Sequence, residues 1–272
     1  MPLTQFDSGY DLQPFRSLCE NYPDETVYPS KHFRVEWGPI FHRGRLDGSA
    51  RILIIGQDPA QTENIVRRIL VGEAGRRIQG FLAKLGINLS YAMIKTYLYS
   101  VYGGAPAKVR RDPRLIGYRN QWIDALLVGQ HVEAVVALGT LAEEAWGFWK
   151  DTPNGQQSTI PFVKITHPTQ PESSSKGDKA KHAEATRKML AGWNAAIGTL
   201  RPAIHHTDFP PTAPLYGNDF AEGEKPPIPE FDFPAGLPLW MREKDGWARR
   251  VGTTDEAKRA NITLKIPAEY LD

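Results

Sequence analysis

A continuous apolar run from Ile52 to Gly56 is the feature that most constrains how this chain can fold. The run is rich in β-branched side chains, which is typical of a strand buried on both faces in a parallel sheet. Gln57, Asp58 and Pro59 follow it, and they stop the strand and begin a loop. Because ligands of open α/β sheets bind outside the carboxyl ends of the strands, Gln57 and Asp58 are candidate site residues.

A second β-rich run, near residues 161–166, delivers polar side chains in the same way. His167, Pro168 and Thr169 come directly after it. The carboxyl ends of parallel strands lie at one edge of a sheet, so we expect this strand end and the end of the first strand to face one pocket.

The remaining pattern predicts an α/β fold. Apolar stripes at helical spacing alternate with β-rich runs, and the order βαβαβα favours a parallel sheet with helices on both faces. We therefore expect a three-layer α/β/α architecture with a four-stranded parallel sheet. The expected strands are 52–56, 93–101, 133–139 and 161–166, and the main expected helices are 75–85, 118–128, 140–149 and 173–200.

The composition changes near residue 200. We predict that residues 1–200 form one domain, with an aromatic-rich N-terminal segment, residues 1–45, packed on it. Nine of the 22 prolines lie between Pro202 and Pro238. We therefore expect residues 201–272 to form an extended Pro-rich arm rather than an independent domain, and to wrap the core and close a sheet edge.

The net charge of +2 and the single cysteine narrow the classes of function. A charge this small does not by itself indicate nucleic acid. Cys19 alone excludes an intrachain disulfide and an all-cysteine iron–sulfur site. No apolar run approaches the roughly 20 residues that span a bilayer, and the N-terminus lacks the pattern of a signal peptide. We expect a cytoplasmic monomer without metal, cofactor or membrane association.

Asp58 and His167 each have a catalytic and a structural interpretation. Asp58 could orient or deprotonate a water, or it could be a loop aspartate that accepts hydrogen bonds from neighbouring N–H groups. His167 could donate a hydrogen bond to a developing oxyanion, or it could be an ordinary histidine of a surface loop. Clusters of arginine and lysine after the predicted strand ends could form a solvated face or a rim that tracks phosphates.

Taken together, these motifs resemble the uracil-DNA glycosylase superfamily. Gly56-Gln57-Asp58-Pro59 is identical to the start of the first motif of its best-known family, and His167-Pro168-Thr169 resembles the second motif, His-Pro-Ser. Residues 71–75 and 134–140 resemble the thermostable iron–sulfur branch, although Cys19 alone cannot build that cluster. The order and spacing agree over about residues 46–200.

The resemblance implies excision of uracil from DNA in base-excision repair, with free uracil as the product and no cofactor. Asp58 would position the water and stabilise the cationic sugar, and His167 would hydrogen-bond uracil O2. Substrate-binding positions would be Gly56, Gln57, Pro59, Ala60, Gln61, Leu70, Lys95 and Tyr97. DNA-binding positions would be Pro168, Thr169, Gln170, Ser173, Ser174 and Lys176.

Several positions depart from the family's motifs. Ala60 stands where the best-known family has the tyrosine that excludes thymine, and Leu70 stands where an aromatic stacks on uracil. The asparagine that reads the base is missing from the second strand, where Lys95 or Tyr97 could replace it. Two alternatives follow: a protein that binds uracil-containing or damaged DNA without turnover, or a glycosylase for hypoxanthine, xanthine or mismatched thymine.

Overall fold

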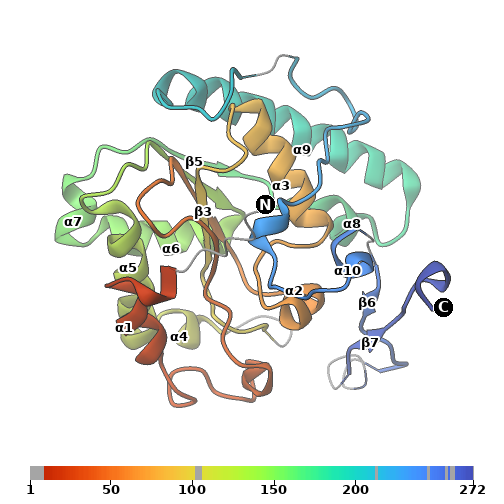
Figure 1. The fold of residues 1–272 in the computed structure, drawn as a ribbon, viewed down its shortest axis with the longest axis horizontal. Helices are drawn as coiled ribbons and strands as arrows, with labels where there is room; N and C mark the ends of the chain where they lie inside the picture. The colour runs from red at the N-terminus through yellow and green to blue at the C-terminus, as the bar shows by residue number, and fades with distance from the viewer. Residues whose placement is uncertain are drawn as a thin grey trace.

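A five-stranded sheet forms the centre of the computed structural model, which describes residues 9–101, 106–211, 214–243, 246–254, 257 and 261–271 (Figure 1). The strand order is β1-β3-β2-β4-β5, and all neighbours are parallel except β1 and β3. The strands are β1 (His42–Gly44), β2 (Ile52–Gly56), β3 (Tyr91–Lys95), β4 (Ala134–Leu138) and β5 (Phe162–Ile165).

The prediction of an α/β fold is confirmed, but the sheet has one strand more than expected. The additional strand, β1, pairs antiparallel with β3 and begins with His42 opposite Ile94. Its sequence, His-Arg-Gly, has no apolar side chain and therefore no strand pattern. The second predicted strand, 93–101, is displaced: β3 ends at Lys95, and Thr96 turns out of the sheet to donate from its N–H and hydroxyl to the Gly56 carbonyl.

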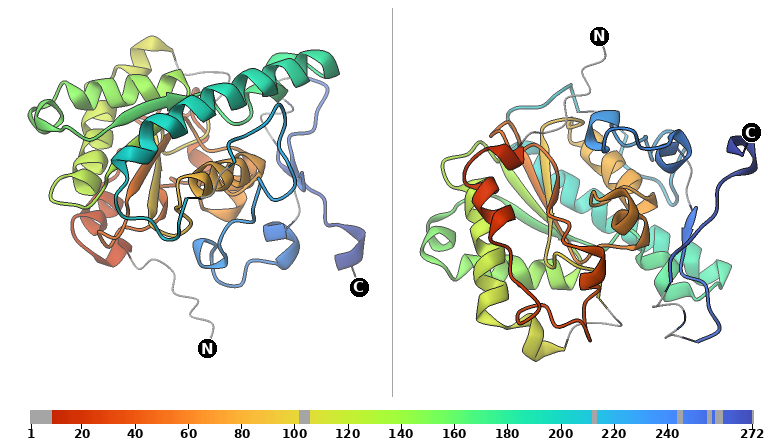
Figure 2. Two further views of the ribbon diagram at one scale, coloured as in Figure 1. Left: turned by 90° about the horizontal axis from the view of Figure 1, so that it is seen from above. Right: turned by 60° about the horizontal axis from the view of Figure 1, so that its bottom comes forward.

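Helices cover both faces of this sheet, as the alternation of side chains in β2 requires (Figures 1 and 2). Leu53 and Ile55 pack in one core with α1 (Phe15–Glu20), α5 (Pro113–Leu127) and α6 (Thr140–Lys150). Ile52 and Ile54 pack in a second core with α3 (Glu73–Lys84) and α9 (Lys179–Leu200). The remaining helices are α2 (Gln61–Val66), α4 (Ala107–Arg110), α7 (Pro153–Gln157), α8 (Gln170–Ser175), α10 (Leu239–Glu243) and the 3-10 turns η1 (Gly9–Asp11), η2 (Val35–Trp37), η3 (Arg201–Ala203), η4 (Glu230–Asp232) and η5 (Ala268–Tyr270).

The predicted helix 173–200 is two helices, α8 and α9. Lys176 adopts a left-handed conformation with φ 49°, and Gly177 follows with φ 89°. Asp178 then caps α9, because its side chain accepts a hydrogen bond from the Lys181 N–H at 3.0 Å. The break gives α8 a direction of its own, next to the end of β5.

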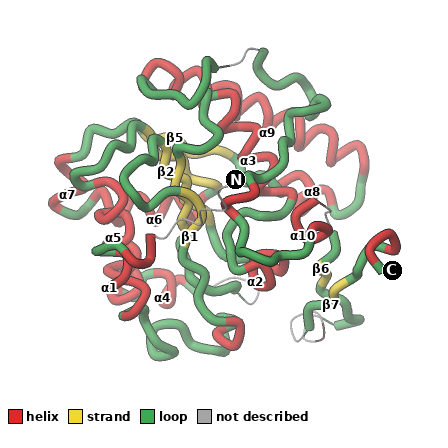
Figure 3. Tube along the Cα trace, viewed as in Figure 1, coloured by secondary structure: helices red, strands yellow, loops and turns green. Residues whose placement is uncertain are grey.

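The C-terminal arm, residues 201–272, runs over the molecule mostly as loops and turns (Figure 3). The Asp208 carboxylate accepts hydrogen bonds from three successive N–H groups that begin at Asn88. Asp232 is buried against the β1 and β3 side chains, and Trp240 and Trp247 pack on the end of α2. The arm adds no strand to the central sheet within the described ranges; β6 (Ala248–Arg249) and β7 (Thr263–Leu264) form a separate hairpin.

The described helices include none that combines the length and the apolar character needed to cross a bilayer.

Candidate active site

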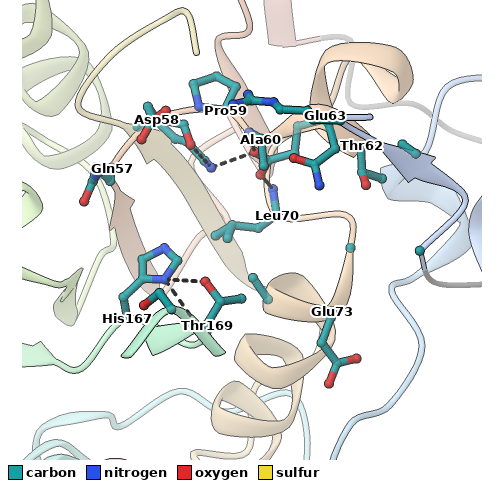
Figure 4. Close-up of a pocket in the computed structure, with 18 of the residues that line it drawn as sticks. Gln57, Asp58, Pro59, Ala60, Thr62, Glu63, Leu70, Glu73, His167 and Thr169 are labelled. Carbon is teal, nitrogen blue, oxygen red and sulfur yellow. Dashed lines mark hydrogen bonds and ion pairs between the residues drawn. The ribbon is translucent and has the colours of Figure 1, made fainter. Parts of the chain in front are cut away.

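A cavity of about 590 Å³ opens at the carboxyl ends of β2, β3 and β5 (Figure 4). This is the position at which open α/β sheets bind ligands. The cavity contains the two candidate catalytic side chains together. It is lined by Gln57, Asp58, Pro59, Ala60, Gln61, Thr62, Glu63, Leu70, Gly72, Glu73, Ala74, Lys95, His167, Thr169, Gln170, Ser173, Gly246, Trp247, Ala248 and Arg250.

Asp58 lies two residues beyond β2, and one of its carboxylate oxygens accepts a hydrogen bond from the Val101 N–H at 3.1 Å. Burial raises the pKa of Asp58, while the Lys95 ammonium and the hydrogen bond from Val101 act in the opposite direction. The hydrogen bond comes from a residue 43 positions farther along the chain, so it is a tertiary contact and not a bond to a neighbouring N–H group. The side chain also lines the cavity, where a carboxylate can orient a water or face a positive charge.

His167 reaches the cavity from the loop after β5, on the side opposite Asp58 (Figure 4). Its Nδ1 accepts hydrogen bonds from the N–H of Thr169, at 3.3 Å, and from the Thr169 hydroxyl, at 3.1 Å. Burial, with help from the nearby Lys95 cation, lowers the pKa of His167 to about 4. At neutral pH the ring is therefore neutral with its proton on Nε2, which makes it a hydrogen-bond donor.

Lys95 and Glu63 form a buried ion pair beside Asp58. The Lys95 ammonium donates to the Glu63 carboxylate at 2.8 Å and to the Asp58 carbonyl at 2.6 Å. Glu63 also accepts hydrogen bonds from the N–H groups of Ala60 and Leu70. The pair thereby connects β3 to Ala60, directly after the first motif, and to Leu70, beyond α2.

Leu70 forms a wall of the cavity in an unusual backbone conformation, with φ 53°. Its carbonyl lies against Gly75 in α3, where an added Cβ would come within 1.6 Å of the Leu70 oxygen. Only glycine permits this approach. Gly75 and Glu63 together hold the loop so that the Leu70 side chain borders the space between Asp58 and His167 (Figure 4).

Arg77, on α3, connects this helix to the segment that carries His167. Its guanidinium donates to the Pro168 carbonyl at 2.5 Å, to Glu172 of α8 at 2.6 Å, and to Glu73 at 3.0 Å. The side chain is buried, so these charge-assisted bonds are shielded from solvent. Arg77 therefore fixes the position of the His167 loop relative to α3.

Eleven of the predicted site residues line the cavity and five do not. Tyr97 packs into the core, with its ring 5.5 Å from that of Phe33, so it does not replace the missing asparagine. Gly56 lies beneath the Lys95 side chain. Pro168 is buried, whereas Ser174 and Lys176 are exposed on or beside α8. The proposed contacts of these last two residues with DNA stay predictions.

Nine further cavity residues were not predicted from the sequence; they lie in α2, at the start of α3 and in the arm. Glu63 had a recognisable signal, because a glutamate at the third position of a helix often bonds back to the N–H before the helix. Nothing in the sequence connects the arm to the strand ends. These additional residues are Thr62, Glu63, Gly72, Glu73, Ala74, Gly246, Trp247, Ala248 and Arg250.

Within the described ranges, no group of three or more histidine, cysteine, aspartate or glutamate side chains is arranged to bind a metal ion.

A family model, that of the uracil DNA glycosylase superfamily, matches residues 43–191, more than half of the 272-residue chain. The match covers both motifs and confirms the resemblance drawn from them. No curated protein matches the sequence.

Proposed function

Because the chain belongs to the uracil-DNA glycosylase superfamily, we propose that it hydrolyses the N-glycosidic bond of uracil flipped out of DNA, as the base-removing step of base-excision repair. Membership of the superfamily implies a hydrolytic glycosylase acting on DNA; uracil as the base is our proposal. The observation that carries it is the pairing of Asp58 with a neutral, donating His167 across one cavity.

His167 acts on the leaving base. When the bond between C1′ of the sugar and N1 of uracil breaks, both electrons go to the base and negative charge develops on O2. The Nε2–H of His167 donates a hydrogen bond to this oxygen. A donor already fixed in place, here by Thr169, stabilises such charge more in the transition state than in the ground state.

Asp58 acts on the sugar. Its carboxylate stabilises the positive charge that the sugar acquires and accepts a proton from the water that attacks C1′. This role needs the ionised form, which burial disfavours and the Lys95 cation favours. The Lys95 cation therefore supports the reaction, while the Glu63 carboxylate that holds Lys95 in place raises the pKa of Asp58 to a smaller extent.

DNA reaches the cavity when a nucleotide leaves the stack, which costs a few kcal/mol of unstacking energy. Gln170 and Ser173 of α8 line the cavity, and we propose that they contact the strand on either side of that nucleotide. Ser174 and Lys176 lie farther along the same exposed surface, where we propose further phosphate contacts.

A larger base is the second candidate substrate. Ala60 is exposed and contributes only a methyl group to the cavity wall, and Leu70 is a large apolar side chain of the same wall. This space supports entry of a 5-methylated pyrimidine or a deaminated purine. A protein that binds without turnover is less well supported, since binding alone does not need both Asp58 and His167.

The test is release of base from an end-labelled oligonucleotide that carries one uracil, followed by alkaline cleavage. We expect the wild-type protein to cleave, and Asp58→Asn and His167→Ala each to lose about 100-fold or more in rate. His131→Ala, which changes an exposed histidine, is the matched control.

Full activity in both variants would contradict the assignment of the site. No release of uracil by the wild-type protein, with release of hypoxanthine, xanthine or mismatched thymine, would favour the second candidate. Binding without release of any of these bases would favour the protein without turnover.

A further inference from the structure

One side of the catalytic cavity is built by the C-terminal arm. Gly246, Trp247, Ala248 and Arg250 line it together with Asp58 and His167. These arm residues lie outside residues 43–191, the part of the chain that the family model matches. The arm therefore supplies a wall of the site in addition to the matched region.

This wall is anchored by packing. Trp247 and Ala248 are buried with Val66 and Val71, which lie just before and after the Leu70 loop. The Trp247 ring also meets that of Trp240 edge to face, with 5.3 Å between centroids. Its carbonyl accepts a hydrogen bond from the Lys265 N–H at 2.8 Å, which continues the β6–β7 hairpin.

The two adjacent arginines of the hairpin have different environments. Ala248 and Arg250 line the cavity, while Arg249 is exposed and its Nε donates to the Gly246 carbonyl at 2.9 Å. This follows from the alternation of side chains along an extended chain. Arg250 and Arg249 therefore form a matched pair, one inside the cavity wall and one outside it.

The charges of the cavity assign a role to Arg250. Asp58, Glu63 and Glu73 are the acidic lining residues, and Lys95 and Arg250 are the basic ones. Lys95 is buried, whereas Arg250 is partly exposed and directly follows β6, which contacts α2. A nucleotide whose base enters this cavity leaves its flanking phosphates outside, where a guanidinium can bind two phosphate oxygens at once.

We propose that Arg250 binds a DNA phosphate beside the flipped nucleotide, so that β6 and the residue after it form a DNA-binding wall of the active site. The proposal rests on the proposed function, because it assumes a DNA substrate. Its test is a binding measurement and does not require that any base be released.

The experiment compares the full-length protein with Arg250→Gln, Arg250→Lys and Arg249→Gln. Binding to a fluorescent uracil oligonucleotide, and to the same oligonucleotide with thymine, is followed by anisotropy over a series of KCl concentrations. We expect Arg250→Gln to weaken binding to both about tenfold, as loss of a charge-assisted contact does. The slope of log affinity against log salt should fall by about 0.7 to 0.9, the value for one phosphate.

Arg250→Lys should keep the slope and recover only part of the affinity, because lysine lacks the planar fork. Arg249→Gln should change affinity less than twofold. An unchanged slope in Arg250→Gln, or an equal loss in Arg249→Gln, would overturn the proposal. A loss confined to the uracil oligonucleotide would also overturn it, since that would indicate contact with the base.

Two controls distinguish the loss of a phosphate contact from unfolding of the hairpin and from failure of the proposed function. Thermal melting and tryptophan fluorescence of Arg250→Gln show whether the hairpin stays folded; if it does not, Arg250→Lys decides. If the wild-type protein binds both oligonucleotides but releases no base, the proposed function fails while the comparison of salt slopes still decides the role of Arg250.

Discussion

Three charged or ionisable residues set the protonation state of the cavity. Lys95 lies close enough to Asp58 and His167 to lower the pKa of both. Burial acts in opposite directions on the two groups: it raises the pKa of the Asp58 carboxyl and lowers that of the imidazole to about 4. As pH falls, Asp58 therefore takes up its proton at a higher pH than an ordinary aspartate, and His167 takes one up at a lower pH than an ordinary histidine.

The pH dependence of base release should show that Asp58 is ionised and His167 is neutral at neutral pH. We expect the single-turnover rate to stay level through neutral pH and to fall in acid, as Asp58 is protonated. His167→Asn should be slower but keep the same acidic fall, whereas Asp58→Asn should be slow and lack it. A fall centred near pH 6.5, the usual histidine value, that disappeared in His167→Asn would contradict a neutral imidazole.

Arg77 is the side chain that joins α3 to the loop that carries His167. It bonds at once to Glu73 on its own helix, to the Pro168 carbonyl and to Glu172 on α8. Glu73 in turn accepts from Lys225 of the arm at 3.1 Å. Helix, loop and arm thus share one network of charge-assisted bonds directly behind His167.

Replacing Arg77 should displace His167 while leaving its chemistry intact. We expect Arg77→Gln to lower the single-turnover rate about 10- to 100-fold, because small displacements of a catalytic group have effects of this size. Arg77→Lys should recover only part of the rate, since one ammonium cannot reach all three partners. Arg187→Gln, on the exposed face of α9, is the control; a rate for Arg77→Gln equal to that of this control would refute the positioning role.

Elements with a strong local pattern could be predicted from the sequence. The apolar runs of β2 and β4 and the stripe of α3 gave strands and a helix close to their observed bounds. The strand β1 could not be predicted, because the buried Arg43 has its partners, Asp232 among them, far away in the sequence. The break between α8 and α9 carried a signal, Gly177 followed by Asp178, and was missed because the apolar stripe continued beyond it.

The candidate site, like the fold, could be predicted only where its residues belong to a local sequence motif. Asp58, His167 and Leu70 follow from local motifs at strand ends, and the cavity contains them. Glu63 could have been found from its place in α2. Trp247 and Arg250 could not, because only the tertiary fold brings the arm to the strand ends.

At the scale of the whole molecule, Asp232 joins the arm to the edge of the sheet. Its carboxylate accepts hydrogen bonds from Arg43 at 3.2 Å, from Arg45 and from the Tyr91 hydroxyl. The Arg43 and Asp232 side chains are fully buried. Two cations and a hydroxyl around one carboxylate satisfy charges that would otherwise be costly to bury.

Asp232→Asn should therefore destabilise the protein markedly. Removing one partner of a buried ion pair leaves the other charge uncompensated, and we expect the free energy of unfolding to fall by about 3 to 5 kcal/mol. Urea denaturation followed by tryptophan fluorescence measures the loss. Glu222→Gln, on the exposed part of the arm, should change stability by less than about 0.5 kcal/mol. A loss for Asp232→Asn below 1 kcal/mol would show that the arm is held elsewhere.

The residues of the β6 wall are the last residues of the cavity to be synthesised. A ribosome makes the chain from its N-terminus at roughly 5–20 residues per second. Asp58, Leu70 and His167 precede Trp247 and Arg250 in the sequence, so they are synthesised several seconds before the residues of this wall. The set of residues that lines the cavity is complete only once Arg250 has been synthesised.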